Sequence, residues 1–371
     1  MKAIKNVKII KGGAILPETV LLYDDTVLGF ATEVPAGAEV TDGEGAYLSA
    51  GFIDQHIHGY IGEDAMTHTP DHIRAGLPAN GVTAYLPTTM TQSKEAIDQA
   101  MNWVREAMKK EEGARVLGCH MEGPFINAAK KGAQPGEYII PPAIEMVETY
   151  KDVIKLVTYA PEQDEDHAFV KALRKMNIVP SVGHTSANFE TAKAAYDNGA
   201  LSTTHFFNAM PPLHHRDPGV IGAALAGDAY IELIADTIHV NPNLFSILAK
   251  LKPNRLCLIT DCMEAGGLPN GEYALGGQPV FVKDGFCTLE DGTLAGSVLK
   301  LNVAIRNMAK YGGVTLAQAV SFATENPARL LGVDDRMGTL NVGTLADFVL
   351  MDEACNVKST YMGGKCVYAG N

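Results

Sequence analysis

The sequence has few basic residues, a single tryptophan and no long apolar run. Its 30 lysine and arginine residues are outnumbered by 43 aspartate and glutamate residues, which gives a formal net charge of -13. Because nucleic-acid binding depends on a basic surface, this balance argues against DNA or RNA as a partner. A small anionic ligand is not excluded, since a few local cations can outweigh the global charge. No apolar stretch of about 18 residues occurs, so we expect no membrane span.

The cysteines lack the pairwise spacing of a zinc-binding motif, and none of them lies in a C-x-x-C pair. Their scatter is typical of reduced thiols in a cytosolic protein. The first ten residues intersperse lysines among apolar residues, which does not fit the core of a signal peptide. We therefore expect a cytoplasmic protein. The six cysteines are Cys119, Cys257, Cys262, Cys287, Cys355 and Cys366.

The middle of the chain alternates between apolar strand candidates and helical patterns, which predicts a (β/α)8 TIM-like barrel over residues 51–339. A glycine-rich stretch at 266–296 predicts a hairpin insertion in this barrel, and the connection 205–227 is long and irregular. The eight strand candidates are residues 51–57, 82–87, 115–121, 154–160, 178–183, 201–205, 230–236 and 255–260. The helical patterns are residues 71–80, 93–111, 143–150, 165–176, 189–198, 242–250, 298–311, 316–324 and 327–331.

Both ends of the chain contain short strand candidates bounded by turn residues, and neither end resembles the middle. Chain termini commonly lie close together in folded domains. We therefore predict a small β-sandwich domain built from residues 1–50 and 340–371.

Residues 51–59 are the most informative stretch, because an apolar run ends there in His56 and His58. On a strand, side chains at i and i+2 share a face, so both imidazoles would point the same way. Two imidazoles in that arrangement can bind one metal ion. A single His-X-His is weak evidence on its own, since so short a motif occurs by chance.

Four more potential ligands, Glu122, His184, His205 and Asp261, each follow another apolar run. In a barrel, residues at the carboxyl ends of the strands meet on one rim, where active sites lie. Taken singly, each residue has a structural alternative. A histidine could simply be hydrogen-bonded in the core or at the surface, Glu122 could be a buried carboxylate paired with a donor, and Asp261 could stabilise a turn. The shared rim favours a ligand role for all of them, together with His56 and His58.

Imidazole and carboxylate ligands suit divalent ions such as zinc or iron. Such an ion, with one or two bound per subunit, would lower the pKa of a bound water to about 7 and so create a nucleophile. A nearby carboxylate could then take up and deliver protons. The sequence therefore predicts a metal-dependent hydrolase.

Several longer motifs strengthen this hypothesis. Met-Glu-Gly-Pro-Phe at 121–125 and Thr-His-Phe-Phe-Asn-Ala-Met-Pro at 204–211 occur together in this chain. With residues 51–59, they make the chain resemble the amidohydrolase superfamily, and within it the N-acetylglucosamine-6-phosphate deacetylase family. The resemblance extends over nearly the whole length and also includes residues 130–134, 180–185, 235–240, 259–263 and 294–297.

The resemblance implies an enzyme that hydrolyses N-acetylglucosamine 6-phosphate to glucosamine 6-phosphate and acetate, with a metal-activated water as nucleophile. It implies that Glu122, His184 and His205 hold one ion, and that His56, His58 and Asp261 hold a second. Asp261 would also act as general base and then as general acid. The alternative within the family is a deacetylase of another N-acetylhexosamine phosphate, such as N-acetylgalactosamine 6-phosphate.

The resemblance also implies a homodimer, because Arg216 in relatives reaches into the site of the neighbouring subunit. His239 would contact the sugar or the amide carbonyl, and thus take part in catalysis. Gln134 departs from relatives that have histidine at its position. The residues implied in substrate binding are Ala133, Gln134, Asn208, Ala209, Arg216, His239, Leu294, Ala295 and Gly296.

Two more distant alternatives remain open at this point. A cyclic-amide hydrolase on the same scaffold would use a bridging lysine, and none follows the expected strand. A non-catalytic metal-binding relative would have lost ligands or the acid–base residue, and this chain has Asp261 together with each expected ligand.

Overall fold

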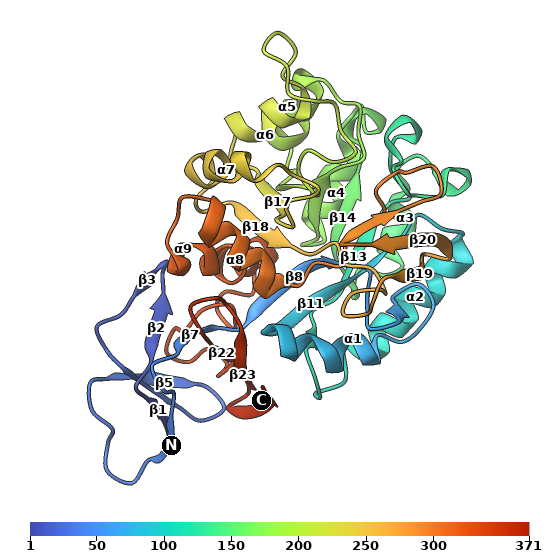
Figure 1. The fold of residues 1–371 in the computed structure, drawn as a ribbon. Coiled ribbons are helices and arrows are strands. Elements are labelled where there is room, and N and C mark those ends of the chain that lie inside the picture. The colour runs from blue at the N-terminus through green and yellow to red at the C-terminus, as the bar shows by residue number, and fades with distance from the viewer. Residues whose placement is uncertain (371) are drawn as a thin grey trace.

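A computed structural model describes residues 1–370 and shows a barrel of eight parallel strands. Neighbouring barrel strands follow one another in sequence, and helices lie around the outside (Figure 1). The predicted (β/α)8 barrel is therefore confirmed. Its strands are β8 (Phe52–Ile57), β11 (Val82–Thr89), β13 (Cys119–Glu122), β14 (Ile154–Tyr159), β15 (Val179–Val182), β16 (Ser202–Thr203), β17 (Tyr230–Ile234) and β18 (Leu256–Ile259), with β12 (Arg115–Val116) pairing beside β11.

The barrel closes between β18 and β8 through individual hydrogen bonds at the carboxyl ends of these strands. The backbone N–H of Asp261 donates to the carbonyl of His56 at 2.9 Å. The Thr260 hydroxyl donates to the buried carboxylate of Asp54 at 2.6 Å. The first and last strands of the barrel are thus joined directly beside two of the predicted ligands.

The helices lie close to the predicted ranges, with one exception. α6 (Gly219–Ala226) lies in the connection 205–227, where no helix was predicted. Its residues Gly-Val-Ile-Gly-Ala-Ala-Leu-Ala are apolar all round, so no polar face marks a helical period. The others are α1 (Asp71–Gly76), α2 (Lys94–Ala107), α3 (Ile144–Glu148), α4 (Ala168–Lys175), α5 (Phe189–Asp197), α7 (Phe245–Leu251), α8 (Leu301–Tyr311), α9 (Leu316–Ser321) and α10 (Glu325–Leu331), with short 3-10 helices η1 (Leu77–Asn80), η2 (Ala128–Lys130), η3 (Gly136–Tyr138), η4 (Pro161–Gln163) and η5 (Pro242–Leu244).

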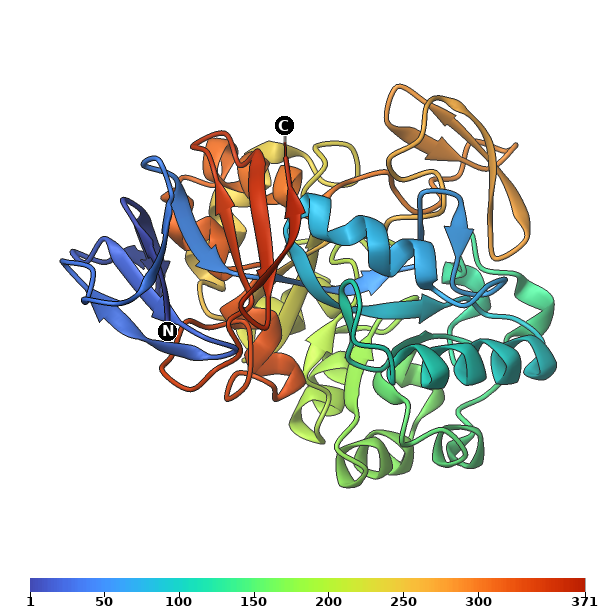
Figure 2. The same ribbon diagram turned by 90° about the horizontal axis from the view of Figure 1, so that it is seen from below.

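A small β domain is formed by strands from both ends of the chain, which lie side by side in Figure 2. One sheet has the order β5-β4-β1-β6, and the other has the order β24-β23-β22-β7-β2-β3. Ile4 and Leu21 from the first sheet and Leu48 and Phe348 from the second share one buried cluster, as expected for a sandwich. The strands are β1 (Lys2–Lys5), β2 (Lys8–Lys11), β3 (Ala14–Ile15), β4 (Val20–Tyr23), β5 (Val27–Ala31), β6 (Glu39–Asp42), β7 (Tyr47–Ala50), β22 (Phe348–Met351), β23 (Val357–Met362) and β24 (Lys365–Ala369).

The predicted small domain from both termini is thus confirmed as an architecture. The boundaries proposed for it, at residues 50 and 340, stay a prediction. Asn371, the last residue of the predicted range, lies outside the described residues.

The insertion after β18 is a three-stranded antiparallel sheet, where the sequence predicted one hairpin. Its strands are β19 (Gly271–Leu275), β20 (Gln278–Lys283) and β21 (Phe286–Thr288). The turn at Gly276 donates its N–H to the Asp64 carboxylate at 2.8 Å and accepts from Gln92 at 2.9 Å. Asp64 ends β10 (Glu63–Asp64), which pairs with β9 (Gly59–Tyr60), so the insertion is fixed to the segment that follows the His-X-His motif.

Among residues 1–370, no helix combines the length and the apolar character needed to cross a membrane.

We predict that the ion pair between Arg115 and Asp347 ties the small domain to the barrel. The Asp347 carboxylate is 1% exposed, accepts two bonds from Arg115 at 3.0 and 3.2 Å, and accepts the Gly363 N–H at 2.7 Å. Asp347→Ala should lower the free energy of unfolding by about 1–3 kcal/mol, because the partly buried donors Arg115 and Gly363 lose a charged partner. Urea-induced unfolding followed by circular dichroism measures this.

The exposed pair of Arg105 and Asp152 is the matched control, with the same two-bond geometry at 2.8 and 3.0 Å. Asp152→Ala should change stability by no more than about 1 kcal/mol, because solvent screens exposed pairs. Equal losses in both variants would contradict a special role for Asp347.

Candidate metal centre

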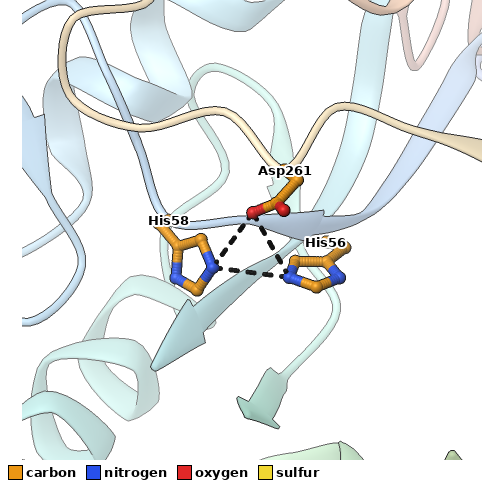
Figure 3. Close-up of side chains that lie close together, drawn as sticks. All are labelled: His56, His58 and Asp261. Atoms are coloured by element: carbon orange, nitrogen blue, oxygen red, sulfur yellow. Dashed lines mark hydrogen bonds and ion pairs between the residues drawn. The ribbon is translucent and has the colours of Figure 1, made fainter. Parts of the chain in front are cut away.

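The carboxyl ends of the barrel strands bring the six predicted ligands together. Their ligand atoms form two groups, and within each group the atoms lie within 4.8 Å of one another. His56, His58 and Asp261 form the first group, drawn in Figure 3. Glu122, His184 and His205 form the second. All six residues are buried, so their polar atoms need partners inside the protein.

Three of these residues have an unusual backbone. His184, His205 and Asp261 have φ values of 48°, 27° and 51°, in a region that residues other than glycine rarely adopt. Each follows the end of its strand, so the chain turns at the residue that supplies the ligand atom. Backbone strain of this kind costs about 1–3 kcal/mol per residue and clusters at functional sites.

Glu122 lies between the two groups. Its Oε1 is 3.3 Å from His184 Nε2 and 3.1 Å from His205 Nε2, and its Oε2 is 3.2 Å from His58 Nε2. The next residue, Gly123, has φ of 80°, and a Cβ there would lie 2.1 Å from the Thr91 hydroxyl oxygen. Only glycine therefore lets the chain turn closely enough after Glu122.

The hydrogen bonds of two histidines fix which ring nitrogen is free. His58 Nδ1 lies 3.2 Å from the carbonyl of Thr88, and His184 Nδ1 lies 2.9 Å from the carbonyl of Lys130. A carbonyl can only accept, so each Nδ1 carries the proton and each neutral ring presents a lone pair at Nε2. His184 Nε2 faces His205 Nε2 at 2.9 Å. Lone pairs and carboxylate oxygens thus converge, and a divalent cation fits this donor set.

The electrostatics agree with a site for positive charge. Burial disfavours an imidazolium at His58, but the hydrogen bonds and charges of Asp261 and Glu122 outweigh it and raise its pKa to about 9. At Glu122, burial disfavours the carboxylate, yet the surrounding imidazoles, led by His56, lower its pKa well below the usual value. The cluster therefore stabilises added positive charge, whether carried by protons or by a metal ion.

A cavity of about 260 Å³ opens above this cluster. Seven of the nine residues predicted to bind substrate line it, while Ala295 is buried behind the wall and Arg216 is exposed on a loop. Four further lining residues were not predicted to bind substrate. One of them, Gly132, lies within the motif at 130–134, and the other three lie outside the quoted motifs. The seven are Ala133, Gln134, Asn208, Ala209, His239, Leu294 and Gly296, and the four are Met90, Gly132, Leu275 and Thr293.

Gln134 uses both ends of its amide within the protein. Its Nε2 donates to Glu122 Oε2 at 2.8 Å, and its Oε1 accepts the Thr91 N–H at 2.6 Å. In this arrangement Gln134 orients Glu122, and both polar ends of its amide already have a partner within the protein.

His239 is held by Asp236, a residue that the sequence did not single out. The Asp236 carboxylate accepts from His239 Nδ1 at 2.6 Å and from its backbone N–H at 2.9 Å. Burial opposes the charged imidazole, but Asp236, with help from Asp261, outweighs it and raises the pKa of His239. The i, i+3 spacing of the two residues was the available signal in the sequence.

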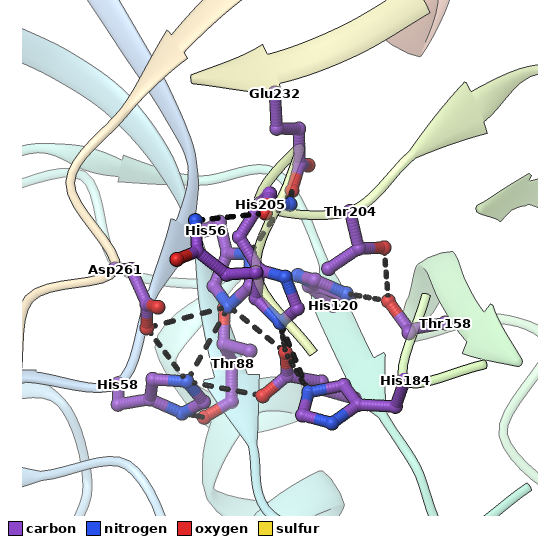
Figure 4. A network of polar contacts seen from close by, with 12 residues as sticks. His56, His58, Thr88, His120, Thr158, His184, Thr204, His205, Glu232 and Asp261 are labelled. Atoms are coloured by element: carbon purple, nitrogen blue, oxygen red, sulfur yellow. Dashed lines mark hydrogen bonds and ion pairs between the residues drawn. The ribbon is translucent and has the colours of Figure 1, made fainter. Parts of the chain in front are cut away.

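His120 lies one layer below the candidate metal ligands. Its Nε2 is 2.7 Å from the Thr158 hydroxyl, and its ring packs edge-on against His56 with centroids 4.5 Å apart (Figure 4). Burial and the neighbouring His56 lower the pKa of His120 well below its usual value, so it is a neutral ring in the barrel core.

Comparison with known proteins gives consistent matches. Residues 47–367 match the amidohydrolase family model. An N-acetylglucosamine-6-phosphate deacetylase of Bacillus subtilis is 41% identical, with 90% of this chain and 88% of the relative covered. An N-acetylgalactosamine-6-phosphate deacetylase of Escherichia coli is 35% identical, with 92% and 94% covered. The crystal structure of N-acetylglucosamine-6-phosphate deacetylase from Pasteurella multocida superimposes with a TM-score of 0.94 at 29% identity, covering all of both chains.

We predict that removing bound metal lowers the thermal stability of the protein. A ligand that binds only the folded state adds about 2.7 kcal/mol at 100 times its dissociation constant. Chelator-treated protein should therefore melt at a lower temperature, and added zinc or ferrous ion should restore the transition. Metal analysis and calorimetry on the same samples measure both effects.

Glu122→Gln should abolish most of this response, whereas His72→Ala should retain it, because the His72 side chain is 75% exposed and outside both groups. A stripped protein with an unchanged melting temperature would contradict the prediction.

Proposed function

Because the chain belongs to the amidohydrolase family, we propose that it hydrolyses N-acetylglucosamine 6-phosphate to glucosamine 6-phosphate and acetate. One observation carries this proposal. The candidate metal cluster, which includes Asp261, lies at the floor of a cavity, and residues of the motifs at 130–134, 204–211, 235–240 and 294–297 line its walls. The high coverage of deacetylase relatives, in sequence and in structure, supports the same substrate class.

We propose that Glu122, His184 and His205 hold one divalent ion and that His56, His58 and Asp261 hold a second. Zinc and iron suit the mixed imidazole and carboxylate donors. An ion bound there supplies Lewis acidity, which polarises the amide carbonyl and lowers the pKa of water.

Asp261 is the proposed general base and acid. Its Oδ1 lies 3.2 Å from His58 Nε2, and the residue lines the cavity floor. Asp261 takes a proton from the water that attacks the amide carbonyl. When the C–N bond breaks, it returns this proton to the nitrogen, because an unprotonated amine anion is a very poor leaving group. The products are acetate and the free amino sugar.

His239 lies at the cavity wall and stabilises the negative charge that develops on the carbonyl oxygen, or holds the sugar beside it. The Asp236 contact keeps its Nδ1 occupied, so Nε2 is the nitrogen available to substrate. The other walls position the substrate for attack. Asn208 and Ala209 lie on the proposed sugar-phosphate side, Ala133 and Gln134 line the proposed acetyl end, and Leu294 and Gly296, with Ala295 buried between them, flank the pocket.

Arg216 is proposed to contact the phosphate of substrate bound in a second subunit. Its side chain is exposed, is near His214 and His215, and does not line the cavity of its own chain. An exposed basic patch in an acidic protein suits an anionic group. This role requires a homodimer, which we include in the proposal.

N-acetylgalactosamine 6-phosphate is the second candidate substrate, because one relative at 35% identity is named for that activity. The relative named for the glucosamine substrate is 41% identical, which favours that epimer. A cytoplasmic location completes the proposal and agrees with six free cysteines, all within the described residues. Acetate release from both epimers, measured side by side, tests the substrate.

We predict that Asp261→Asn loses about 100- to 10,000-fold in turnover, the range of general acid–base contributions. The fold and the ion held by Glu122, His184 and His205 should remain. Acetate release by the purified, metal-loaded variant measures the effect. Asp284→Asn, in the exposed β20–β21 turn, is the matched control and should keep full turnover. Normal turnover in the Asp261 variant would refute the assignment.

We also predict complementation between two inactive variants. In a mixed dimer of Asp261→Asn and Arg216→Ala chains, one site has both an intact Asp261 and an intact Arg216 from its partner. At saturating substrate for wild type, random mixing should recover about one quarter of wild-type activity, because half of the twofold dimers then carry one complete site.

Mixing Asp261→Asn with His184→Ala is the control, since both residues belong to the site of their own chain and no complete site forms. Equal behaviour of the two mixtures would show that Arg216 does not act across subunits.

A further inference from the structure

The His56 ring contacts potential ligand atoms on one side and a carboxylate on the other. Its Nε2 lies 3.4 Å from His58 Nε2 and 3.6 Å from Asp261 Oδ1, within the first ligand group. Its Nδ1 lies 3.1 Å from Glu232 Oε2. A carboxylate accepts, so Nδ1 carries the proton and the Nε2 lone pair points into the group.

Glu232 is fully buried in β17 and receives donors from three directions, as Figure 4 shows around its label. Oε2 accepts from His56 Nδ1 and from the backbone N–H of His205, each at 3.1 Å. Oε1 accepts from Gln55 Nε2 at 2.8 Å. The Glu232 carbonyl also accepts the Phe206 N–H at 2.8 Å.

His56 differs in this respect from the other three histidines of the cluster. The Nδ1 atoms of His58 and His184 contact backbone carbonyls, and His205 Nδ1 has no hydrogen-bond partner among residues 1–370. A carboxylate behind a histidine fixes its tautomer and ring orientation and makes it a stronger ligand than a carbonyl does. Within residues 1–370, a carboxylate supports a histidine in this way only in the first group, at His56.

We propose that Glu232 is a positioning residue that sets the affinity of the second metal ion, the one held by His56, His58 and Asp261. The inference rests on the proposed metal-dependent function. Glu232 thereby determines whether the enzyme works with one ion or two at a given metal concentration. Glu232 also accepts the backbone N–H of His205, so it holds a residue of each ligand group and fixes the distance between the two groups.

Glu232→Gln is the informative variant, because the structure can accommodate it. With the new amide oxygen at the Oε2 position, His56 and His205 keep an acceptor. The new amide NH2 then faces Gln55, whose Oε1 has no partner among the described residues. A flip of the Gln55 amide supplies that acceptor, so every hydrogen bond is kept and only the negative charge is lost.

Equilibrium dialysis of metal-free protein against zinc, read by elemental analysis, measures the two binding steps without any substrate. Wild type should bind two ions per chain. Glu232→Gln should keep the tight first ion and bind the second about 10- to 100-fold more weakly, the range for loss of a carboxylate behind a histidine ligand. Adding Glu232→Gln to His56→Asn, which removes the supported ring, should cause no further loss.

Asp164→Asn is the matched control: it also removes a buried carboxylate that accepts backbone N–H groups, at the start of α4 and outside both ligand groups. It should bind both ions as wild type does. Three results would overturn the proposal: a wild type that binds one ion only, equal weakening of both ions in Glu232→Gln, or unchanged binding. Absence of deacetylase activity with the predicted binding pattern would refute the proposed function and leave the role of Glu232 intact.

Discussion

The structure of the rim depends on one constraint, a buried carboxylate surrounded by imidazole nitrogens. Glu122 places one oxygen toward His184 and His205 and the other toward His58. None of these groups can be satisfied by solvent, because all of them are buried. Gln134 holds the carboxylate from the cavity side. The residues at this end of the barrel therefore supply oriented donors and acceptors to one another around the Glu122 carboxylate.

The sequence predicted the large features because they follow from local patterns. Eight apolar runs with polar ends gave the strands, and the rule that strand ends share a rim brought the six ligand candidates to one place. α6 was missed because its residues are apolar all round. The insertion was predicted as a hairpin, but Phe286–Thr288 adds a third strand that is too short for a visible alternation.

The residues that hold the histidines of the site in place were harder to predict, for a different reason. Asp236 and Glu232 act on His239 and His56 through hydrogen bonds, and Glu232 is 176 positions from its partner. An acidic residue inside an apolar strand shows only that it needs a partner, and not which one. The positive φ angles of His184, His205 and Asp261 were equally hidden, since histidine and aspartate do not mark such a turn as glycine does.

The sheet of the small domain has a consequence for the order of events during protein synthesis. β7 is paired on one side with β2 and on the other with β22, where Ser49 faces Val349. The first strands leave the ribosome early, but their sheet keeps an open edge until the entire barrel has been translated. Such an edge is prone to pair with other chains. Completion of this sheet by β22 therefore cannot precede synthesis of the barrel, because residues 348–351 follow the barrel in the chain.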